Sequence, residues 1–345
     1  MGGEPGDFLT LGMESSCDDS AVALLRGRRT VVSELLSSQV EDHSPFGGVV
    51  PEFAARMHLE AFLPLSVEAL RRGGVSSPST EIGLIAVTAG PGLMGSLLVG
   101  VMAAKALSLA WGVPLVGVNH LEGHIFANVV SFPELEPPFL CMIVSGGHTE
   151  IVLAEEFGKY LFLGGTRDDA AGEAYDKVAK VLGLPYPGGP AVDRLASGGN
   201  PGAFDFPVPL KGQDSIAFSF SGLKTAVINE IGRLKGMGTP LPLEDICASF
   251  QRAAVEALVG KLELAVKRTG VSTVALSGGV AANRALREKL ARKRGWKVFL
   301  PPVHRCTDNA VMIAAAGYAA FLRGERSSLK LSPDPAWELW AEQLE

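Results

Sequence analysis

Apolar and polar positions along the chain alternate in blocks that are typical of short strands followed by longer helices. The stretches FLTLGMESSCDDSAVALLRG (8–27) and FLCMIVSGGHTEIVLAEE (139–156) each contain an apolar run, a small polar turn and a second apolar run. Both predict β-hairpins, and their glycines and serines would let backbone N–H groups approach an anion. Because such a unit opens each half of the chain, we expect two related halves. Two unrelated hairpins would give the same local pattern.

The segments between and after these hairpins predict an alternation of helices and strands. In the first half we expect an amphipathic helix over 54–70, strands over 82–88 and 114–118, a helix over about 96–110, and a helix from His120 capped by Asn119. In the second half we expect helices at DDAAGEAYDKVAKVLGL, after YPGG, over 243–268 and from Ala282, strands at STVALSGG and WKVFLPP, and a loop-rich insertion over about 200–213. This order predicts an α/β protein with parallel sheets.

The glycines of the first half allow two other interpretations. Residues 82–104 carry no charge and are long enough to span a bilayer, but their glycines favour a buried strand, a turn and a buried helix. The run GPGLMG (90–95) matches a dinucleotide-binding pattern, which also needs an acidic residue near the end of the next strand. No acidic residue lies between Gly95 and Glu122, so we expect these glycines to serve packing and a tight turn.

Composition narrows the class of protein. The 345 residues suit two domains, and 47% hydrophobic residues with 41 glycines suit a glycine-turn-rich α/β core. The four cysteines lie far apart without a C-x-x-C pair, and the N-terminal residues lack a signal-peptide pattern; both favour a cytoplasmic location. The net charge of −6 means that any polyanion must be bound by a local patch or a partner. The basic run NRALREKLARKRGWK (283–297) is either a solvated helix face or a phosphate-binding patch.

The stretch VNHLEGHIFAN (118–128) places two histidines one helical turn apart. A zinc protease would need H-E-x-x-H, whereas this chain has H-x-E-x-H. Glu122 would then lie roughly 200° around the helix from His120, pointing away from the metal face. His120 and His124 therefore suit a metal ion that is not used to make a hydrolytic nucleophile.

Several ordered motifs together resemble one family over residues 11–318. They are MESSCDDSA, FGGVVPEFAARMH, NHLEGH, VSGGHTEIV, DDAAGEAYDKVAK, YPGGPAVD, FSFSGLKTAV, SGGVAANRALR and TDNAVMIAAAG. This set is similar to the tRNA N6-adenosine threonylcarbamoyltransferases of the bacterial type, once called O-sialoglycoprotein endopeptidases. The family places a threonylcarbamoyl group on N6 of the adenosine just 3′ of the anticodon, in tRNAs that read codons starting with A. The donor is threonylcarbamoyl-AMP, and AMP leaves.

The resemblance implies an actin-like, Hsp70-like (ASKHA) α/β fold, in which two RNase-H-like halves close over an adenine nucleotide in a cleft. We expect one half to comprise residues 1–135 and about 310–345, and the other residues 136–309. The family's ligands for one divalent metal, Fe²⁺ or Zn²⁺, fall on His120, His124 and Asp308. Relatives from archaea and eukaryotes have a tyrosine ligand where this chain has Ile143, which supports the bacterial type.

The resemblance also implies a set of substrate contacts: Ile143, Val144, Ser145, Gly146, Gly147, Asp176, Gly189, Asp193 and Asn283. Taken singly, Asp176 would be a solvated helix carboxylate and Asn283 a helix cap. As candidates for the base that takes the proton from the attacking amine we choose Asp18 and Asp19, with Asp18 preferred. Lys224 in FSFSGLKT (218–225) would either meet a phosphate or be solvated.

Family members act on tRNA together with a shorter actin-like paralogue (TsaB-type) and a small ATPase (TsaE-type), and a separate synthase makes the threonylcarbamoyl-AMP. The helix expected over 54–70 would either pack against the paralogue or be buried in the core. Two other classes stay open from the sequence, a metalloprotease and an actin-like ATPase or sugar kinase. No contact with a membrane is expected.

Overall fold

The structure, a computed structural model, describes residues 7–238, 240–340 and 342–343. These residues divide into two compact units: unit 1 comprises residues 7–136 and 307–340, and unit 2 comprises residues 137–238, 240–306 and 342–343. The chain therefore leaves unit 1 after its first third and returns to it near the C-terminus. Asp308, like the two candidate histidines, belongs to unit 1.

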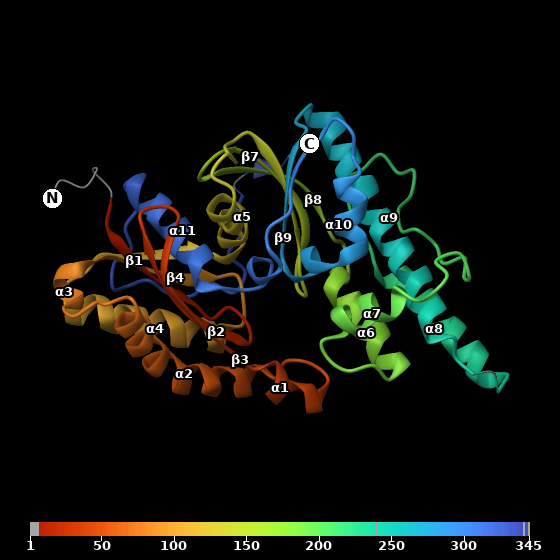
Figure 1. The fold of residues 1–345 in the computed structure, drawn as a ribbon, viewed down its shortest axis with the longest axis horizontal. Coiled ribbons are helices and arrows are strands. Elements are labelled where there is room, and N and C mark those ends of the chain that lie inside the picture. The colour runs from red at the N-terminus through yellow and green to blue at the C-terminus, as the bar shows by residue number, and fades with distance from the viewer. Residues whose placement is uncertain (1–6, 239, 341, 344–345) are drawn as a thin grey trace. The chain divides into compact units, whose positions relative to one another are not determined.

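The sheet of unit 1 combines an antiparallel meander with parallel strands (Figure 1). Its order is β3-β2-β1-β4-β5, with β1 Leu9–Glu14, β2 Asp19–Arg26, β3 Thr30–Ser38, β4 Ile82–Gly90 and β5 Leu115–Asn119. The helices are α1 Val40–His43, α2 Pro51–Arg72, α3 Pro78–Glu81, α4 Met94–Trp111, α5 His120–Ser131 and α11 Ala310–Leu322. The first predicted hairpin, β1–β2, is confirmed.

Alternation along β1 decides which side chains reach the candidate site. Leu9, Leu11 and Met13 face the core that α2 and α4 cover. The intervening positions face the opposite side of the sheet, where a Cβ on Gly12 would lie 2.3 Å from the carbonyl oxygen of Ala310 at the start of α11. Glu14 shares this second face with Gly12 and thus points towards α5 and α11.

The sheet of unit 2 repeats this plan. Its order is β10-β9-β6-β7-β8-β11, with β6 Phe139–Val144, β7 Thr149–Glu156, β8 Lys159–Gly165, β9 Thr273–Ser277, β10 Lys297–Phe299 and β11 Glu342–Gln343. The helices are α6 Ala171–Leu182, α7 Gly188–Ala196, α8 Ser221–Gly236, α9 Leu243–Thr269 and α10 Arg284–Ala291. Strands β8-β7-β6-β9-β10 match β3-β2-β1-β4-β5 in order and direction. The expected relation between the two halves is confirmed at the level of topology.

Helix α4 departs from the expectation of a buried helix. By length and composition it could cross a membrane, with a mean hydropathy of 1.5, although core helices pass the same test. One side packs on β4 and α2, but Leu98, Met102 and Leu109 are 46%, 52% and 71% exposed. On the adjoining α2, Leu59, Leu63 and Val67 are exposed too. We call these six residues the apolar patch. Within the part of unit 1 that the structure describes, each helix is covered on its other face.

The glycines of GPGLMG (90–95) serve close packing, as expected. A Cβ on Gly92 would lie 2.4 Å from the carbonyl oxygen of Ser16, and the N–H of Leu93 donates to that oxygen at 2.7 Å. Ser96 donates to the carbonyl of Cys17 at 3.0 Å. This turn therefore holds the tip of the first hairpin in place.

Candidate functional site

Three potential metal ligands meet in unit 1. His120 and His124 lie one turn apart at the start of α5, which the side chain of Asn119 caps as predicted. Asp308 comes just before Asn309, whose side chain caps the start of α11. Because α5 and α11 pack against each other, the N-terminal ends of both helices bring these side chains together. We call His120, His124 and Asp308 the metal cluster.

The distances within the metal cluster fit one small cation. Oδ1 of Asp308 lies 3.5 Å from Nε2 of His120 and 3.3 Å from Nε2 of His124. Two ligands about 2.0–2.1 Å from a tetrahedral ion lie roughly 3.3–3.4 Å apart. Both histidines are buried and Asp308 is partly exposed. Two imidazoles with one carboxylate suit zinc or iron and leave coordination positions open.

Glu14 fixes the orientation of His120. Its Oε2 lies 3.1 Å from Nδ1 of His120 and accepts a hydrogen bond from Thr88 at 2.6 Å, while its Oε1 accepts from the N–H of Ser16 at 2.5 Å. With Nδ1 engaged, Nε2 is left to face Asp308, which is the arrangement that carboxylates give to metal-binding histidines. Glu14 was not among the residues expected at the metal site; the alternation along β1 is the sequence signal that places it beside α5.

Electrostatic attraction strengthens the contact between Glu14 and His120. Burial opposes charging of both groups, but the attraction between them lowers the pKa of Glu14 and, with the charge of Asp308, raises the pKa of His120 to about 9. A metal ion on Nε2 would take the place of the proton that this field attracts. The negative charge around His120 therefore favours a bound cation.

Glu122 is unable to serve this site as a protease base. Its carboxylate forms an ion pair with Arg323 at 3.3 Å, so it is held at the far end of α11 from Asp308. The metalloprotease alternative therefore lacks its catalytic carboxylate.

Asp18 and Asp19 lie at the tip of the first hairpin, near the metal cluster. Burial raises the pKa of both carboxyls, and the charge of Asp308 raises them further. The pKa of Asp19 reaches about 7. A cation in the metal cluster would offset the part of each pKa rise that comes from the charge of Asp308. The proton affinity of Asp19 therefore suits exchange near neutral pH.

The second hairpin offers backbone groups at its tip. Gly146 and Gly147 are exposed, and a Cβ on either would meet no atom within 4 Å, so a ligand could approach their N–H groups closely. Ser145 is held in place because its carbonyl accepts from the N–H of Gly172 at 3.1 Å. Ile143 and Val144 are fully buried within β6, so the predicted contacts of these two residues with a substrate are not open at the surface.

The other predicted contacts of unit 2 gather where α6, α7 and α10 meet. Asp176 accepts from the N–H of Gly188 at 2.7 Å, next to Gly189 in the first turn of α7. Asp193 accepts from the N–H of Arg284 at 3.3 Å. Asn283 caps α10 and donates to Oε1 of Gln251 at 2.7 Å. Asp176 and Asn283 thus have structural tasks, and Gly189 and Asp193 lie beside them.

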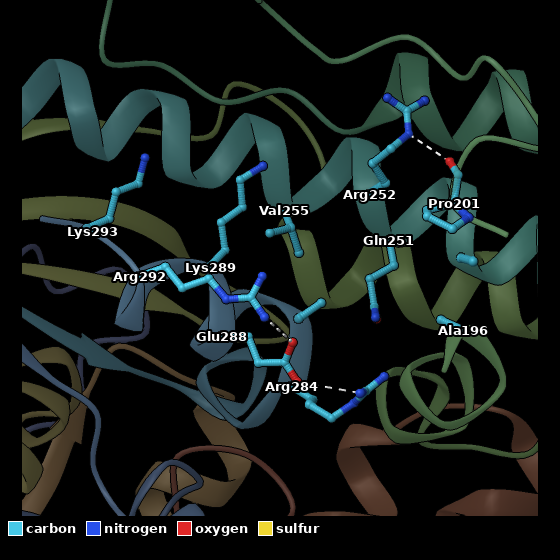
Figure 2. A pocket seen from close by; sticks show the side chains of 12 residues that line it. Ala196, Pro201, Gln251, Arg252, Val255, Arg284, Glu288, Lys289, Arg292 and Lys293 are labelled. Carbon is cyan, nitrogen blue, oxygen red and sulfur yellow. Dashed lines mark hydrogen bonds and ion pairs between the residues drawn. The ribbon is translucent and has the colours of Figure 1, made fainter. Parts of the chain in front are cut away.

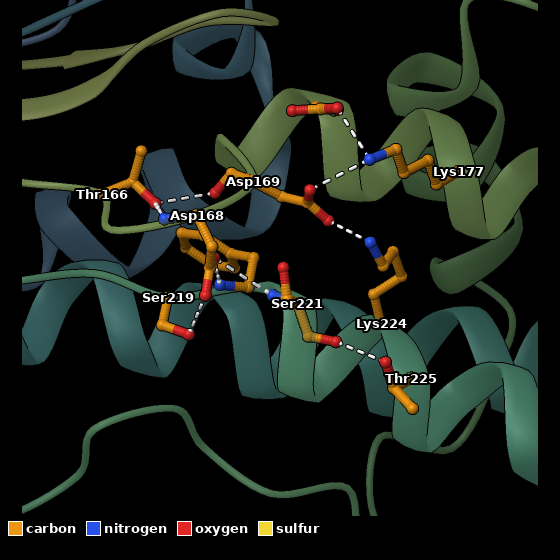
Figure 3. A network of polar contacts seen from close by, with 10 residues as sticks. Thr166, Asp168, Asp169, Lys177, Ser219, Ser221, Lys224 and Thr225 are labelled. Carbon is orange, nitrogen blue, oxygen red and sulfur yellow. Dashed lines mark hydrogen bonds and ion pairs between the residues drawn. The ribbon is translucent and has the colours of Figure 1, made fainter.

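The segment FSFSGLKT has a structural role that the sequence left open (Figure 3). Asp168 accepts from Ser219 at 2.5 Å and from the N–H groups of Phe220 and Ser221 at 2.7 and 3.2 Å, at the start of α8. Asp169 forms ion pairs with Lys177 at 3.0 Å and with Lys224. Lys224 is therefore neither solvated nor available as it stands to a phosphate. The network fastens α8 to the segment before α6.

The sequence is similar to those of one known protein family over most of its length. The family model described as "TsaD: tRNA N6-adenosine threonylcarbamoyltransferase" matches residues 30–315. The enzyme of that name from Gloeobacter violaceus is 52% identical over 319 residues, covering 92% of each chain. The one from Geobacillus thermodenitrificans is 50% identical over 337 residues, covering 96% of this chain and 97% of the relative.

Solved structures agree on the fold. Full-length HypF in its phosphate- and nucleotide-bound form aligns with a TM-score of 0.60 at 16% identity, over 92% of this chain and 56% of HypF. Component A of the Acidaminococcus fermentans (R)-2-hydroxyglutaryl-CoA dehydratase aligns with a TM-score of 0.53 at 16% identity, over 90% and 98%. At this identity they show the fold alone, and it is the expected actin-like ASKHA class. By its match over most of its length, the chain belongs to the tRNA N6-adenosine threonylcarbamoyltransferases, acyltransferases that form threonylcarbamoyladenosine in tRNA.

Proposed function

We propose that His120, His124 and Asp308 hold one Zn²⁺ or Fe²⁺ ion per chain, and that transfer depends on it. The observation that carries this proposal is the convergence of both Nε2 atoms on one oxygen of Asp308, at 3.5 and 3.3 Å. The buried Glu14 behind His120 supports it. When bound, the ion supplies a Lewis acid that orients and polarises the acyl donor.

We propose that the donor is threonylcarbamoyl-AMP from a separate synthase, and that unit 2 binds its adenosine. The open N–H groups of Gly146 and Gly147 suit phosphate or carbonyl oxygens. Asp193, one turn along α7 from Gly189, has a partly buried carboxylate, a group that accepts hydrogen bonds and so suits ribose hydroxyls. Asn283 and Asp176 contribute chiefly by holding the starts of α10 and α7 in place.

The transfer itself forms a bond from N6 of the adenosine to the carbamoyl carbon and breaks the bond from that carbon to the phosphate oxygen of AMP. We propose that Asp18 or Asp19 takes the proton that N6 releases. Both lie at the hairpin tip, close enough to the metal cluster to sense the charge of Asp308. Positioning of the amine against an activated donor supplies much of the acceleration.

We propose that the chain acts in the cytoplasm on tRNA, with a shorter actin-like paralogue and a small ATPase. The apolar patch on α2 and α4 supports a protein partner, because six large apolar side chains there lie at least 46% exposed. Paired helices with apolar stripes suit docking against a similar helix pair. We assign the patch to the actin-like paralogue.

The test of the metal role replaces one proposed metal ligand at a time. His120→Ala and Asp308→Ala are compared with wild type for metal content by mass spectrometry of the purified protein, and for threonylcarbamoyladenosine by mass spectrometry of digested tRNA. His304→Ala and Asp205→Ala are the controls, because both residues are exposed and lie in unit 2 outside the cluster. We expect loss of metal and of product in the ligand variants only. Wild-type metal content and rate in either ligand variant would refute the metal role.

A further inference from the structure

A groove of about 510 Å³ lies in unit 2 between α9 and α10, and most of its charged side chains are cations (Figure 2). Arg252 comes from α9, and Arg284, Lys289, Arg292 and Lys293 come from α10 and the residues just after it. Glu288 is the one carboxylate that lines it. We call this the basic groove. The chain as a whole carries a net charge of −6, so this concentration of positive charge is local.

Lys293 forms a close ion pair with Glu263, whereas the ion pairs of the three arginines are long. Arg284 and Arg292 share Glu288 at 3.5 and 3.6 Å, with side chains 54% and 80% exposed. Arg252 reaches Glu256 at 3.8 Å and Asp205 at 3.9 Å. Pairs of this kind contribute about 0–1 kcal/mol. The guanidinium groups of Arg284 and Arg292 can therefore exchange Glu288 for phosphate oxygens at little cost. Arg252 is held more firmly, because it also donates to the carbonyl oxygen of Pro201 at 2.9 Å.

Lys289 adds a cation that no carboxylate neutralises. Among the residues that the structure describes, it forms no ion pair, and it is one of the side chains that line the groove (Figure 2). Since Glu288 balances only one of its two arginines, the groove keeps a positive excess after all its internal pairs are formed.

The basic groove adjoins the residues to which we assign the adenosine. Gln251 lines the groove and accepts the hydrogen bond from Asn283. Arg284 lines it with its side chain, and its backbone N–H donates to Asp193. The groove therefore starts where the nucleoside contacts of unit 2 end.

We propose that the basic groove binds the phosphate backbone of the substrate tRNA. Arg284 and Arg292 are eight residues apart, about 12 Å along the helix. A nucleic acid strand carries several phosphates over that length. A row of cations of this extent suits a strand better than a single phosphate group. Glu288, between the two arginines, would accept from a ribose 2′-hydroxyl, which favours RNA.

This proposal rests on the assignment of the chain as a tRNA-modifying enzyme. The test distinguishes failure of the groove to bind tRNA from failure of that assignment. The double variant Lys289→Ala/Arg292→Ala is compared with Arg233→Ala/Lys235→Ala, which removes the same charge from the far end of α8 in the same unit. Binding of an unmodified tRNA transcript is measured by fluorescence anisotropy between 50 and 200 mM salt. Rates are measured with the full chain and its partners.

We expect the groove variant to weaken tRNA binding by about tenfold and to reduce the slope of log K against log salt by roughly 1.4, the value for two lost contacts. The KM for tRNA should rise, while kcat and the KM for donor stay within twofold of wild type. Unchanged tRNA affinity and salt slope would overturn the proposal, as would equal losses in the α8 control or loss of a protein partner instead of tRNA. If wild type itself forms no threonylcarbamoyladenosine, the assigned function fails, whereas the binding measurement still decides the groove.

Discussion

Oε2 of Glu14 lies 3.1 Å from Nδ1 of His120, which joins the last residue of β1 to the first residue of α5. This contact ties the hairpin that carries Asp18 and Asp19 to the helix that carries the metal cluster. It also selects the ring nitrogen that faces Asp308. The buried carboxylate of Glu14 thus contacts both the hairpin tip, at Ser16, and the metal cluster, at His120.

Glu14→Gln should therefore weaken the metal site without removing a ligand. The amide keeps the shape but loses the charge that stabilises a cation on His120, and we expect metal affinity to fall by roughly 10–100-fold. Competition with a chromophoric chelator measures that affinity directly. Glu136→Gln, whose carboxylate pairs at the surface with Arg28 and Arg29, is the control. Equal affinity in Glu14→Gln and wild type would show that the contact does not support the metal.

The apolar patch predicts that a charged substitution on α2 prevents binding of the protein partner. Leu63→Glu places a charge in the middle of the stripe on α2, where Leu63 is 67% exposed, so the fold of unit 1 should be kept while binding of the actin-like paralogue is lost. Sedimentation of the mixed proteins measures the complex. Glu60→Ala, an exposed position three residues earlier, should leave it intact. A complex of wild-type affinity with Leu63→Glu would rule out this patch as the docking surface.

Asp169 gives a pH-dependent contribution to the stability of unit 2. Burial alone would raise its pKa, but the hydrogen bonds from Lys224 and Lys177 outweigh it and hold the pKa below the ordinary value. A lowered folded pKa means that the contribution is present above about pH 4 and is lost as the pH falls through the folded pKa.

We expect Asp169→Asn to lower the Tm by roughly 2–4 °C at pH 7, the shift that about 1 kcal/mol gives a domain of this size. The difference from wild type should shrink below about pH 4. Thermal unfolding across pH measures it, and Asp205→Asn, at a fully exposed position, should show no such difference. A Tm difference between Asp169→Asn and wild type that grows as the pH falls would contradict the lowered pKa of Asp169.

Gly12 and Gly232 should respond in opposite directions to alanine. A Cβ on Gly12 would lie 2.3 Å from the carbonyl oxygen of Ala310 and 2.8 Å from Cβ of Ala314, so β1 and α11 must separate, at a cost of about 1–3 kcal/mol. Gly232 lies inside α8 with nothing within 4 Å, and alanine there should add about 0.5–1 kcal/mol. Urea unfolding measures both. A neutral Gly12→Ala would show that α11 is not packed against β1 in this way.

Local pattern predicted much of this fold, since apolar runs bounded by glycine and proline mark β1, β4 and β6, and helical periodicity marks α9. It did not predict β3, whose polar alternation TVVSELLSS is typical of an edge strand, or β8 with its glycines. The helix α8 was also missed, because Asp168, fifty residues away, caps its start. Contacts between distant segments carry no local signal.

The same limit applies to the candidate site. Spacing alone paired His120 with His124, but only family motifs brought in Asp308, which lies in a different part of the chain. Asn283 and Asp176 were expected at the substrate, and the structure shows that both also hold helix starts. The task of Lys224 depended on the position of Asp169, which no periodicity reveals.

The return of residues 307–340 to unit 1 has a consequence for biosynthesis. Asp308 emerges about 180 residues after His124, roughly 10–40 s later at synthesis rates of about 5–20 residues per second. A chain that ends before residue 308 contains both histidines of the metal cluster but lacks its carboxylate. On the proposed metal role, the full set of three ligands exists only after Asp308 has been made, so chains that terminate earlier would not load the ion.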